Sequence, residues 1–394
     1  YRPVFFRLLD GGEEEKQTSL QMNENRFEAV SQDEFNKIPG SPVAYWVSRR
    51  AIAVIDACEI LGRFAHPMHG MSSGNNAEYL RLWHEVSVRH FGRQASEDSG
   101  LVGSQVGKWF PLIKGGPYRK WFGNNDWLIN YESDGHDMKA AQRSGENPGL
   151  RLDNAASFFK PCISWSSVTS GGFSMRSYPQ GFVFGNGGHC VVLEDAVTRR
   201  ALLGAMNSTI MTGLVNSLSP TLNFEVGQVE SFPIAPKLMQ SPTTFGQLVD
   251  GFVAKARADW NAYERSWDFQ SLPLLTASSE PTPTLESSYT AWITQNKGTI
   301  AEMKRLEEEN NRLFIDAYGL ADELTPDVPI EQITLTVNPA YRYGGKLTEE
   351  EQWTRFRQDT MEELVSYAIG CMMGRYSLDA PGLIYAHSGN EGFD

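Results

Sequence analysis

The chain has 394 residues and a formal net charge of −13, and 41% of its residues are hydrophobic. This composition is ordinary for a globular protein, and the length predicts two or three domains. No apolar run approaches the roughly 20 residues of a membrane-spanning helix, which argues against a membrane protein. The four cysteines are far apart in the sequence, which predicts reduced thiols, a cytoplasmic protein and no zinc site.

The first 40 residues predict a strand, an acidic turn and a polar connector. The chain opens on Tyr1 and closes on "NEGFD" with no obvious terminal element, so we expect a piece of a longer protein. A helix is predicted over residues 47–64, with Ser48 as its N-cap because a serine hydroxyl can accept the first free backbone N–H groups.

Residues 65–195 predict a loop-rich region in which short strands alternate with Gly, Asn and Ser clusters. The strand candidates are "WLINYE", "CISWSSV" and "GFVFG". Residues 194–218 keep apolar side chains at helical spacing and predict one helix that ends before Pro220. The next segment, "FEVGQVESFPI", predicts a short strand.

The last third of the chain predicts long helices. Apolar side chains recur at three- and four-residue spacing over residues 245–267 and 285–317, which predicts an antiparallel helical hairpin. A final helix is expected over 348–373, with Thr348 as its cap. The predicted fold is therefore α+β: a connector (1–40), a loop-rich domain with a mixed sheet (41–236), a helical hairpin (237–325) and a small helical C-terminal region (326–394).

Acidic residues are absent from two long stretches of this acidic chain. Residues 99–125 contain four bases and no Asp or Glu, and residues 154–193 contain two bases and again no acid. A face built from these stretches can be positive although the whole chain is negative. An anionic partner is therefore compatible with the overall charge.

Three loops in this region have the composition of nucleic-acid contacts: residues 69–79, 108–125 and 165–178. They combine bases, amides, hydroxyls and glycines, which can bind phosphates and base edges. The alternative is a set of ordinary loops whose aromatic side chains pack into the core. The predicted DNA-contacting residues are Ser72, Ser73, Asn75, Asn76, Lys108, Lys114, Tyr118, Arg119, Lys120, Asn124, Asn125, Ser167, Thr169, Ser170 and Arg176.

Two short motifs are interpreted as structural. "NPAY", residues 338–341, is close to the Asn/Asp-Pro-Pro-Tyr/Phe turn that holds a flipped adenine in amino-methyltransferases. However, the second proline is replaced by Ala340, and no glycine motif for S-adenosylmethionine is present, so an ordinary turn is favoured. His66 and His69 form an H-x-x-H without a suitable third ligand and are interpreted as loop histidines. No catalytic residue, cofactor-binding residue or metal ligand is assigned.

Several longer stretches together resemble the PglX family. The resemblance covers nearly the whole chain and is carried by "HGMSSGNNAEYLRLWHEV", "KWFPLIKGGPYRKWFGNN", "LLGAMNSTIMTGLVNSLSPTLNFEVGQVESFPI" and "YAIGCMMGRYSLDAPGLIYA". PglX proteins are adenine-specific DNA methyltransferases of the BREX (bacteriophage exclusion) defence system. They place their cofactor-binding and catalytic domain before the region that this chain resembles.

The resemblance implies a target-recognition and C-terminal segment without its catalytic domain. It implies S-adenosylmethionine as the cofactor of the parent enzyme, with no cofactor expected in this segment. The implied partners are double-stranded DNA, other BREX proteins and phage DNA-mimic inhibitors. Two alternatives stay open: a protein-interaction scaffold, in which Trp260, Trp267, Trp292 and Trp353 dock other defence components instead of packing in a hairpin core, and, less favoured, an independent enzyme.

Overall fold

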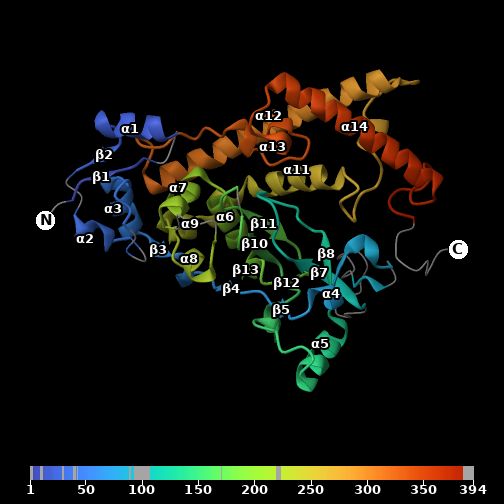
Figure 1. Cartoon of the computed structure of the whole chain (residues 1–394), viewed down its shortest axis with the longest axis horizontal. Helices are drawn as coiled ribbons and strands as arrows, with labels where there is room; N and C mark the ends of the chain where they lie inside the picture. Colours follow the sequence, from blue (N-terminus) through green and yellow to red (C-terminus); the bar gives the residue numbers. More distant parts are fainter. Residues whose placement is uncertain are drawn as a thin grey trace.

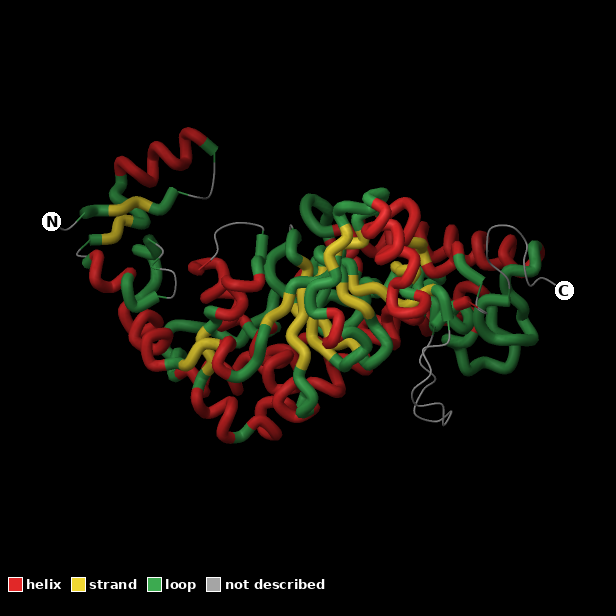
Figure 2. The backbone as a smooth tube through the Cα atoms, turned by 90° about the horizontal axis from the view of Figure 1, so that it is seen from below, coloured by secondary structure: helices red, strands yellow, loops and turns green. Residues whose placement is uncertain are grey.

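The computed structural model describes residues 3–8, 12–28, 31–38, 41, 43–87, 90–92, 107–169, 171–218 and 223–384. Two four-stranded sheets lie beside a layer of long helices, and the N- and C-terminal segments lie at opposite ends of the molecule (Figure 1). Seen from below, the strands occupy the centre and the segment that carries the N-terminus projects from the body (Figure 2). The predicted α+β class is confirmed.

The first large sheet has the order β11-β10-β13-β4 and is antiparallel throughout. Its strands are β4 (Pro67–Met68), β10 (Cys162–Ser166), β11 (Met175–Tyr178) and β13 (Gly188–Val192). The central strand β10 is buried along its whole length, as expected for an apolar run between two neighbours. This sheet therefore positions both the "CISWS" segment and the histidine and glycines that precede Cys190.

The second large sheet has the order β12-β7-β8-β6 and is mixed, because β12 pairs with β7 in parallel. Its strands are β6 (Leu80–Leu82), β7 (Trp109–Ile113), β8 (Trp127–Asn130) and β12 (Val183–Phe184). The first part of the stretch that sequence analysis treated as a loop, residues 108–125, is thus the largely buried strand β7. The strands predicted at "WLINYE", "CISWSSV" and "GFVFG" are confirmed.

Smaller elements surround these sheets. Three two-stranded sheets pair β1 (Phe5–Phe6) with β2 (Arg26–Phe27), β3 (Glu59–Ile60) with β14 (Pro233–Ile234), and β5 (Ser72–Ser73) with β9 (Leu150–Arg151). The shorter helices are α1 (Glu13–Gln21), α2 (Gln32–Phe35), α3 (Arg49–Ala57), α4 (Asn76–Tyr79), α5 (Glu132–Ser144), α8 (Val226–Glu230), α9 (Pro236–Gln240), α10 (Pro242–Gly246) and α13 (Pro339–Tyr343).

The long helical segments agree with prediction except at one break and in the first hairpin helix, which is expected over 245–267 but runs from Val249 to Asn261. The helix expected over 194–218 is two helices, α6 (Ala196–Met206) and α7 (Thr209–Leu218). They separate at Asn207, whose side-chain amide accepts from the backbone N–H of Met175 and donates to its carbonyl oxygen, both at 2.9 Å. The Asn207 side chain therefore pairs with the edge of β11 as a strand would, and the chain turns there.

The remaining helices are α11 (Val249–Asn261), α12 (Leu285–Tyr318) and α14 (Glu349–Met372). The α11 and α12 helices pack together and run in opposite directions, as predicted for a hairpin (Figure 1). The Ser48 and Thr348 hydroxyls accept from backbone N–H groups of the first turns of α3 and α14, which confirms both predicted caps.

Three local predictions are wrong. The acidic "turn" at residues 13–15 is the first turn of α1, where negative charge favours a helix. The helix expected to reach residue 64 ends at Ala57 and is followed by β3. The middle of "FEVGQVESFPI" is helix α8, in which buried Val226 and Val229 lie three residues apart, and only the end of the segment forms β14.

The main core joins the sheet to the helices. It contains Trp165 and Met175 from the first sheet, Met206 from α6, Phe252 from α11 and Phe314 from α12, all buried. A second core lies around β7, β8 and β12. The domain division at residue 236 stays a prediction, and the main core crosses it.

Candidate nucleic-acid interface

The two adjacent bases Arg119 and Lys120 are buried in ion pairs with helices far along the chain. Arg119 donates from Nη2 to Oδ2 of Asp259 on α11 at 2.5 Å, and Lys120 donates from Nζ to Oε2 of Glu307 on α12 at 2.7 Å. Burial alone disfavours the Lys120 ammonium, but the Glu307 carboxylate outweighs it and the pKa of Lys120 is raised. Both cations are therefore neutralised inside the protein.

Additional hydrogen bonds extend these pairs into one network. The Asp259 carboxylate also accepts from the backbone N–H groups of Thr336 and Val337, at 2.7 and 2.9 Å. The Glu307 carboxylate also accepts from Nε1 of Trp121 at 2.7 Å. We call Arg119, Lys120, Trp121, Asp259 and Glu307 the buried hub. It links the β7–β8 connection to α11, α12 and the segment before α13.

Arg176 is also internal, with none of its surface exposed. It donates to the hydroxyls of Tyr178 and Ser166, at 3.1 and 3.0 Å, and to the carbonyl oxygen of Arg119 at 3.2 Å. Every nitrogen of this guanidinium therefore bonds to protein, and because the side chain is fully buried none of its N–H groups is accessible to a partner molecule.

The structure corrects the picture of residues 108–125 as an exposed DNA-facing loop. The buried members of the predicted contact set are Ser73, Arg119, Lys120, Asn124, Asn125, Thr169 and Arg176. Arg119 and Lys120 can be buried because each forms an ion pair with a carboxylate. Asn124 can be buried because its side chain donates to the carbonyl oxygen of Pro117 at 3.0 Å. The glycines have a packing role as well: a Cβ on Gly123 would lie 2.6 Å from Nε of Arg119.

Other parts of the three predicted loops do come together at the surface. The backbone N–H of Gly185 donates to the carbonyl oxygen of Ile113, and that of Asn186 to Met71, both at 2.8 Å. The Ser166 hydroxyl donates to the carbonyl oxygen of Gly116 at 2.9 Å. We call residues 69–76, 113–118, 166–169 and 184–188 the loop cluster. None of these four segments contains Asp or Glu.

The loop cluster exposes a mixed set of polar side chains. Asn75 and Asn76 are exposed, and Ser72, Lys114, Tyr118 and Ser167 are half-buried. Asn75 caps α4 through its Oδ1 atom, and the Ser73 hydroxyl donates to Oδ1 of Asn76 at 2.7 Å. The Lys114 ammonium lies 3.5 Å from the centroid of the Trp127 ring, and burial lowers its pKa.

Of the predicted contact residues that are not buried, Lys108 is not brought into the loop cluster. Lys108 lies before the opposite end of β7, where its backbone N–H donates to His90. Ser170 lies outside the described residues. In contrast, Asn186 is an exposed member of the loop cluster that sequence analysis missed. Its signal is the glycine-rich stretch "FGNGG" at residues 184–188, which lies outside the three predicted loops.

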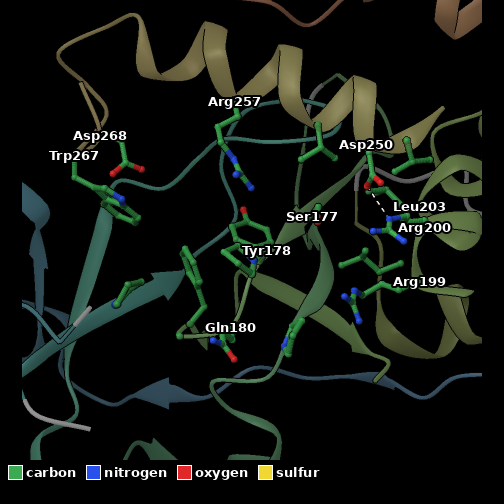
Figure 3. A pocket seen from close by; sticks show the side chains of 18 of the residues that line it. Ser177, Tyr178, Gln180, Arg199, Arg200, Leu203, Asp250, Arg257, Trp267 and Asp268 are labelled. Atoms are coloured by element: carbon green, nitrogen blue, oxygen red, sulfur yellow. Dashed lines mark hydrogen bonds and ion pairs between the residues drawn. The ribbon is translucent and has the colours of Figure 1, made fainter. Parts of the chain in front are cut away.

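A second feature that sequence analysis missed is a cavity of about 900 Å³ between the first sheet, α6 and α11. Figure 3 shows Arg257 reaching down from α11 toward Tyr178, with Arg199 and Arg200 on the neighbouring helix α6. Arg200 pairs with Asp250 at 2.7 Å, and Arg199 donates to the backbone oxygen of Leu193. The Arg257 guanidinium lies 4.9 Å from the centroid of the Phe122 ring, so all three guanidiniums have partners within the protein.

The "NPAY" motif is a structural turn, as sequence analysis favoured. Asn338 caps α13 through its side-chain oxygen, and its amide nitrogen donates to the carbonyl oxygens of Ile330 and Ile333 at 2.7 and 2.8 Å. The side chain is 2% exposed. Its hydrogen-bonding groups are therefore used within the fold, and none is directed at a substrate.

Comparison with known proteins identifies the relatives of the chain. No protein-family model matches it. It is 36% identical over 396 residues to the adenine-specific methyltransferase BrxX of Escherichia coli O9:H4 (strain HS), covering 100% of this chain and 30% of that protein. The chain is homologous to a segment of the BrxX/PglX adenine-specific methyltransferases.

A second BrxX/PglX relative gives the same result. The adenine-specific methyltransferase PglX of Lacticaseibacillus casei (strain Zhang) is 33% identical over 405 residues, covering 97% of this chain and 31% of that protein. The chain thus spans about 30% of the length of both curated relatives. Among the described residues, none of the helices has the length and apolar character to span a membrane.

Proposed function

We propose that this chain is the DNA target-recognition part of a BrxX/PglX-type adenine-specific DNA methyltransferase, and that the loop cluster faces the DNA. The observation that carries the proposal is the convergence of four segments that lack Asp and Glu in a chain that contains 48 acidic residues. Homology to methyltransferases along the whole chain supports the same assignment.

The chemistry of the loop cluster suits base reading more than charge neutralisation. Asn186 offers an exposed amide, which can pair with the N6 and N7 positions of adenine in the major groove. Serine hydroxyls and glycine N–H groups can bind phosphate oxygens. Lys114 is the lysine of this surface, and the buried hub holds the framework on which these side chains stand.

The parent enzyme would transfer a methyl group from S-adenosylmethionine to N6 of adenine, marking self DNA in phage defence. The cofactor and catalytic residues belong to the part of the relatives that this chain does not span. A phage inhibitor that mimics DNA would bind the same surface as the DNA. Methyl transfer by this chain alone would contradict the proposal that recognition and catalysis belong to different parts of the parent enzyme.

The test is fluorescence anisotropy of the chain with duplex DNA over a salt series. The variants are Asn186→Ala and Lys114→Ala, and the matched control is Lys237→Ala, an exposed lysine on α9. If Lys114 contacts a phosphate, its removal should reduce the slope of log K against log salt by about 1. A DNA affinity that does not change with salt concentration would contradict the proposal. An equal change of the salt slope in Lys114→Ala and Lys237→Ala would also contradict it.

A scaffold function is supported by a different observation. Val365, Ile369, Met372 and Met373 are exposed along one side of α14 at helical spacing. The tryptophans first considered for docking belong to cores instead: Trp260 is 3% exposed, and Trp292 and Trp353 pack against the main core. Capture of another defence protein that is lost in Val365→Lys with Ile369→Lys would favour this role.

A further inference from the structure

Two histidines lie opposite each other at the end of the first sheet. The antiparallel register pairs Val191 with Pro67 and Cys190 with Met68, so its continuation places His189 opposite His69. The centroids of the two imidazole rings are 4.8 Å apart. Sequence spacing had grouped His69 with His66, whereas the fold brings it to a histidine 120 residues further along the chain.

A carboxylate from a third segment reaches the same place. Glu225 precedes α8, and the residue before it is held by two hydrogen bonds: the Phe224 N–H donates to Ser167, and its carbonyl oxygen accepts from Nε1 of Trp165, both at 2.8 Å. One ligand atom from each of His69, His189 and Glu225 lies within 4.8 Å of the others. Three independently anchored backbones therefore present three donor groups to one point.

His189 has an unsatisfied ring nitrogen. Its side chain is 2% exposed, and its Nδ1 atom has no hydrogen-bond partner among the residues that the structure describes. Buried polar atoms are nearly always satisfied, so an orphaned imidazole nitrogen beside a second imidazole and a carboxylate requires an explanation. The Trp165 ring, 5.6 Å from the His189 ring, and the Ser164 hydroxyl bond to the His189 carbonyl oxygen hold this residue in place.

We propose that His69, His189 and Glu225 form a binding site for a divalent first-row transition metal ion, of which zinc is the candidate to test. Two imidazoles and one carboxylate are a zinc donor set, whereas magnesium and calcium prefer oxygen ligands alone. Zinc bonds of about 2.0–2.2 Å require the donor atoms to move closer together. His69 and Glu225 are exposed, so their side chains can turn inward toward buried His189.

A metal ion here would fasten the base of the loop cluster. His69 begins the 69–76 segment, His189 directly follows the 184–188 segment, and Phe224 beside Glu225 is bonded to Ser167. Three of the four segments of the loop cluster would therefore be tied to one ion. The site rests on its own geometry and stands whether or not the loop cluster binds DNA.

The experiment measures zinc binding to the whole chain after removal of metal with a chelator. Isothermal titration with ZnCl₂ should give one site per chain, and zinc should raise the Tm. The exposed ligands are the residues to change, since loss of buried His189 threatens the fold. Because loss of an outer-sphere partner already costs about 10- to 100-fold in affinity, His69→Ala and Glu225→Gln should each weaken binding by at least that much.

The matched controls are His66→Ala, three residues before His69, and Glu230→Gln, at the other end of α8, which should bind zinc as the wild type does. Substitution by cobalt(II) identifies the ligands, because cobalt–thiolate absorption would place the metal on cysteines and overturn the proposal. Absence of one-to-one binding in the wild type, or unchanged affinity in both His69→Ala and Glu225→Gln, would also overturn it.

Discussion

The ammonium nitrogen of Lys120 lies 2.7 Å from the carboxylate of Glu307, and the two side chains are 6% and 3% exposed. The two residues are 187 positions apart, so this pair holds the β7–β8 connection against α12. Removing one partner of a buried ion pair leaves a charge without compensation. We therefore expect Lys120→Ala to reduce the free energy of unfolding by about 3–5 kcal/mol, measured by urea denaturation.

The control for this prediction is an exposed ion pair on the same helix. Arg305 pairs with Glu302 and Glu309 on the surface of α12. Exposed pairs contribute about 0–1 kcal/mol, so Arg305→Ala should change stability by no more than that. Equal effects of Lys120→Ala and Arg305→Ala would show that the Lys120–Glu307 pair does not hold the fold as described.

The second prediction concerns charge in the loop cluster. Asn186→Asp places an acid within segments that contain none, so DNA affinity should fall by about tenfold, corresponding to ~1.4 kcal/mol, without a change in Tm. The control is Gln240→Glu on α9, which is exposed and adds the same charge away from the loop cluster. Anisotropy titrations of both variants at one salt concentration distinguish a local effect from a change in net charge.

A third prediction tests the close approach of two backbones in the loop cluster. A Cβ on Gly70 would lie 2.0 Å from the carbonyl oxygen of Gly185, so the two chains would have to separate. We expect Gly70→Ala to reduce the free energy of unfolding by about 1–3 kcal/mol or more. Gly251→Ala is the matched control: it lies in α11 with nothing within 4 Å, and should stabilise by about 0.5–1 kcal/mol. Thermal melts that rank the two variants in the reverse order would refute this account.

The fourth prediction tests whether residues 338–341 have a structural or a catalytic role. Asn338→Asp replaces an amide that donates to two carbonyl oxygens with a carboxylate that repels them. Stability should fall by about 1–3 kcal/mol, the cost of a buried group left unsatisfied. Asn338→Ser keeps an acceptor for the cap but also loses both donated bonds, so it should lose stability too, with no added charge repulsion. If residues 338–341 were a catalytic motif instead, Asn338→Asp should leave the free energy of unfolding unchanged. Chemical denaturation of both variants therefore distinguishes a structural turn from a catalytic motif.

The features that could be predicted from the sequence depend on residues that are close together along the chain. Ser48 and Thr348 cap helices through bonds to residues three positions away, and the apolar spacing of α12 is visible in any stretch of it. The break between α6 and α7 was missed because the apolar spacing continues through it. It depends on Asn207 bonding to Met175, 32 positions earlier.

The candidate site was predicted only in part for the same reason. The composition of residues 108–125 was recognised, but composition does not reveal that Asp259, 140 positions later, takes up the charge of Arg119. Nor does it show that 69–76 and 184–188 are adjacent. The loops were therefore found, while the side chains first chosen from them were in several cases the ones that hold the fold together.

The buried hub limits which segments can be exchanged between relatives of this chain. A chimera that replaces residues 41–236 alone would introduce a foreign β7–β8 connection against Asp259 and Glu307. If the donor lacked matching cations, two buried carboxylates would lose their compensating charges. The smallest transferable cassette therefore extends from the first sheet through α11, α12 and residue 341, where the Tyr341 hydroxyl still donates to the carbonyl oxygen of Tyr118 at 2.5 Å.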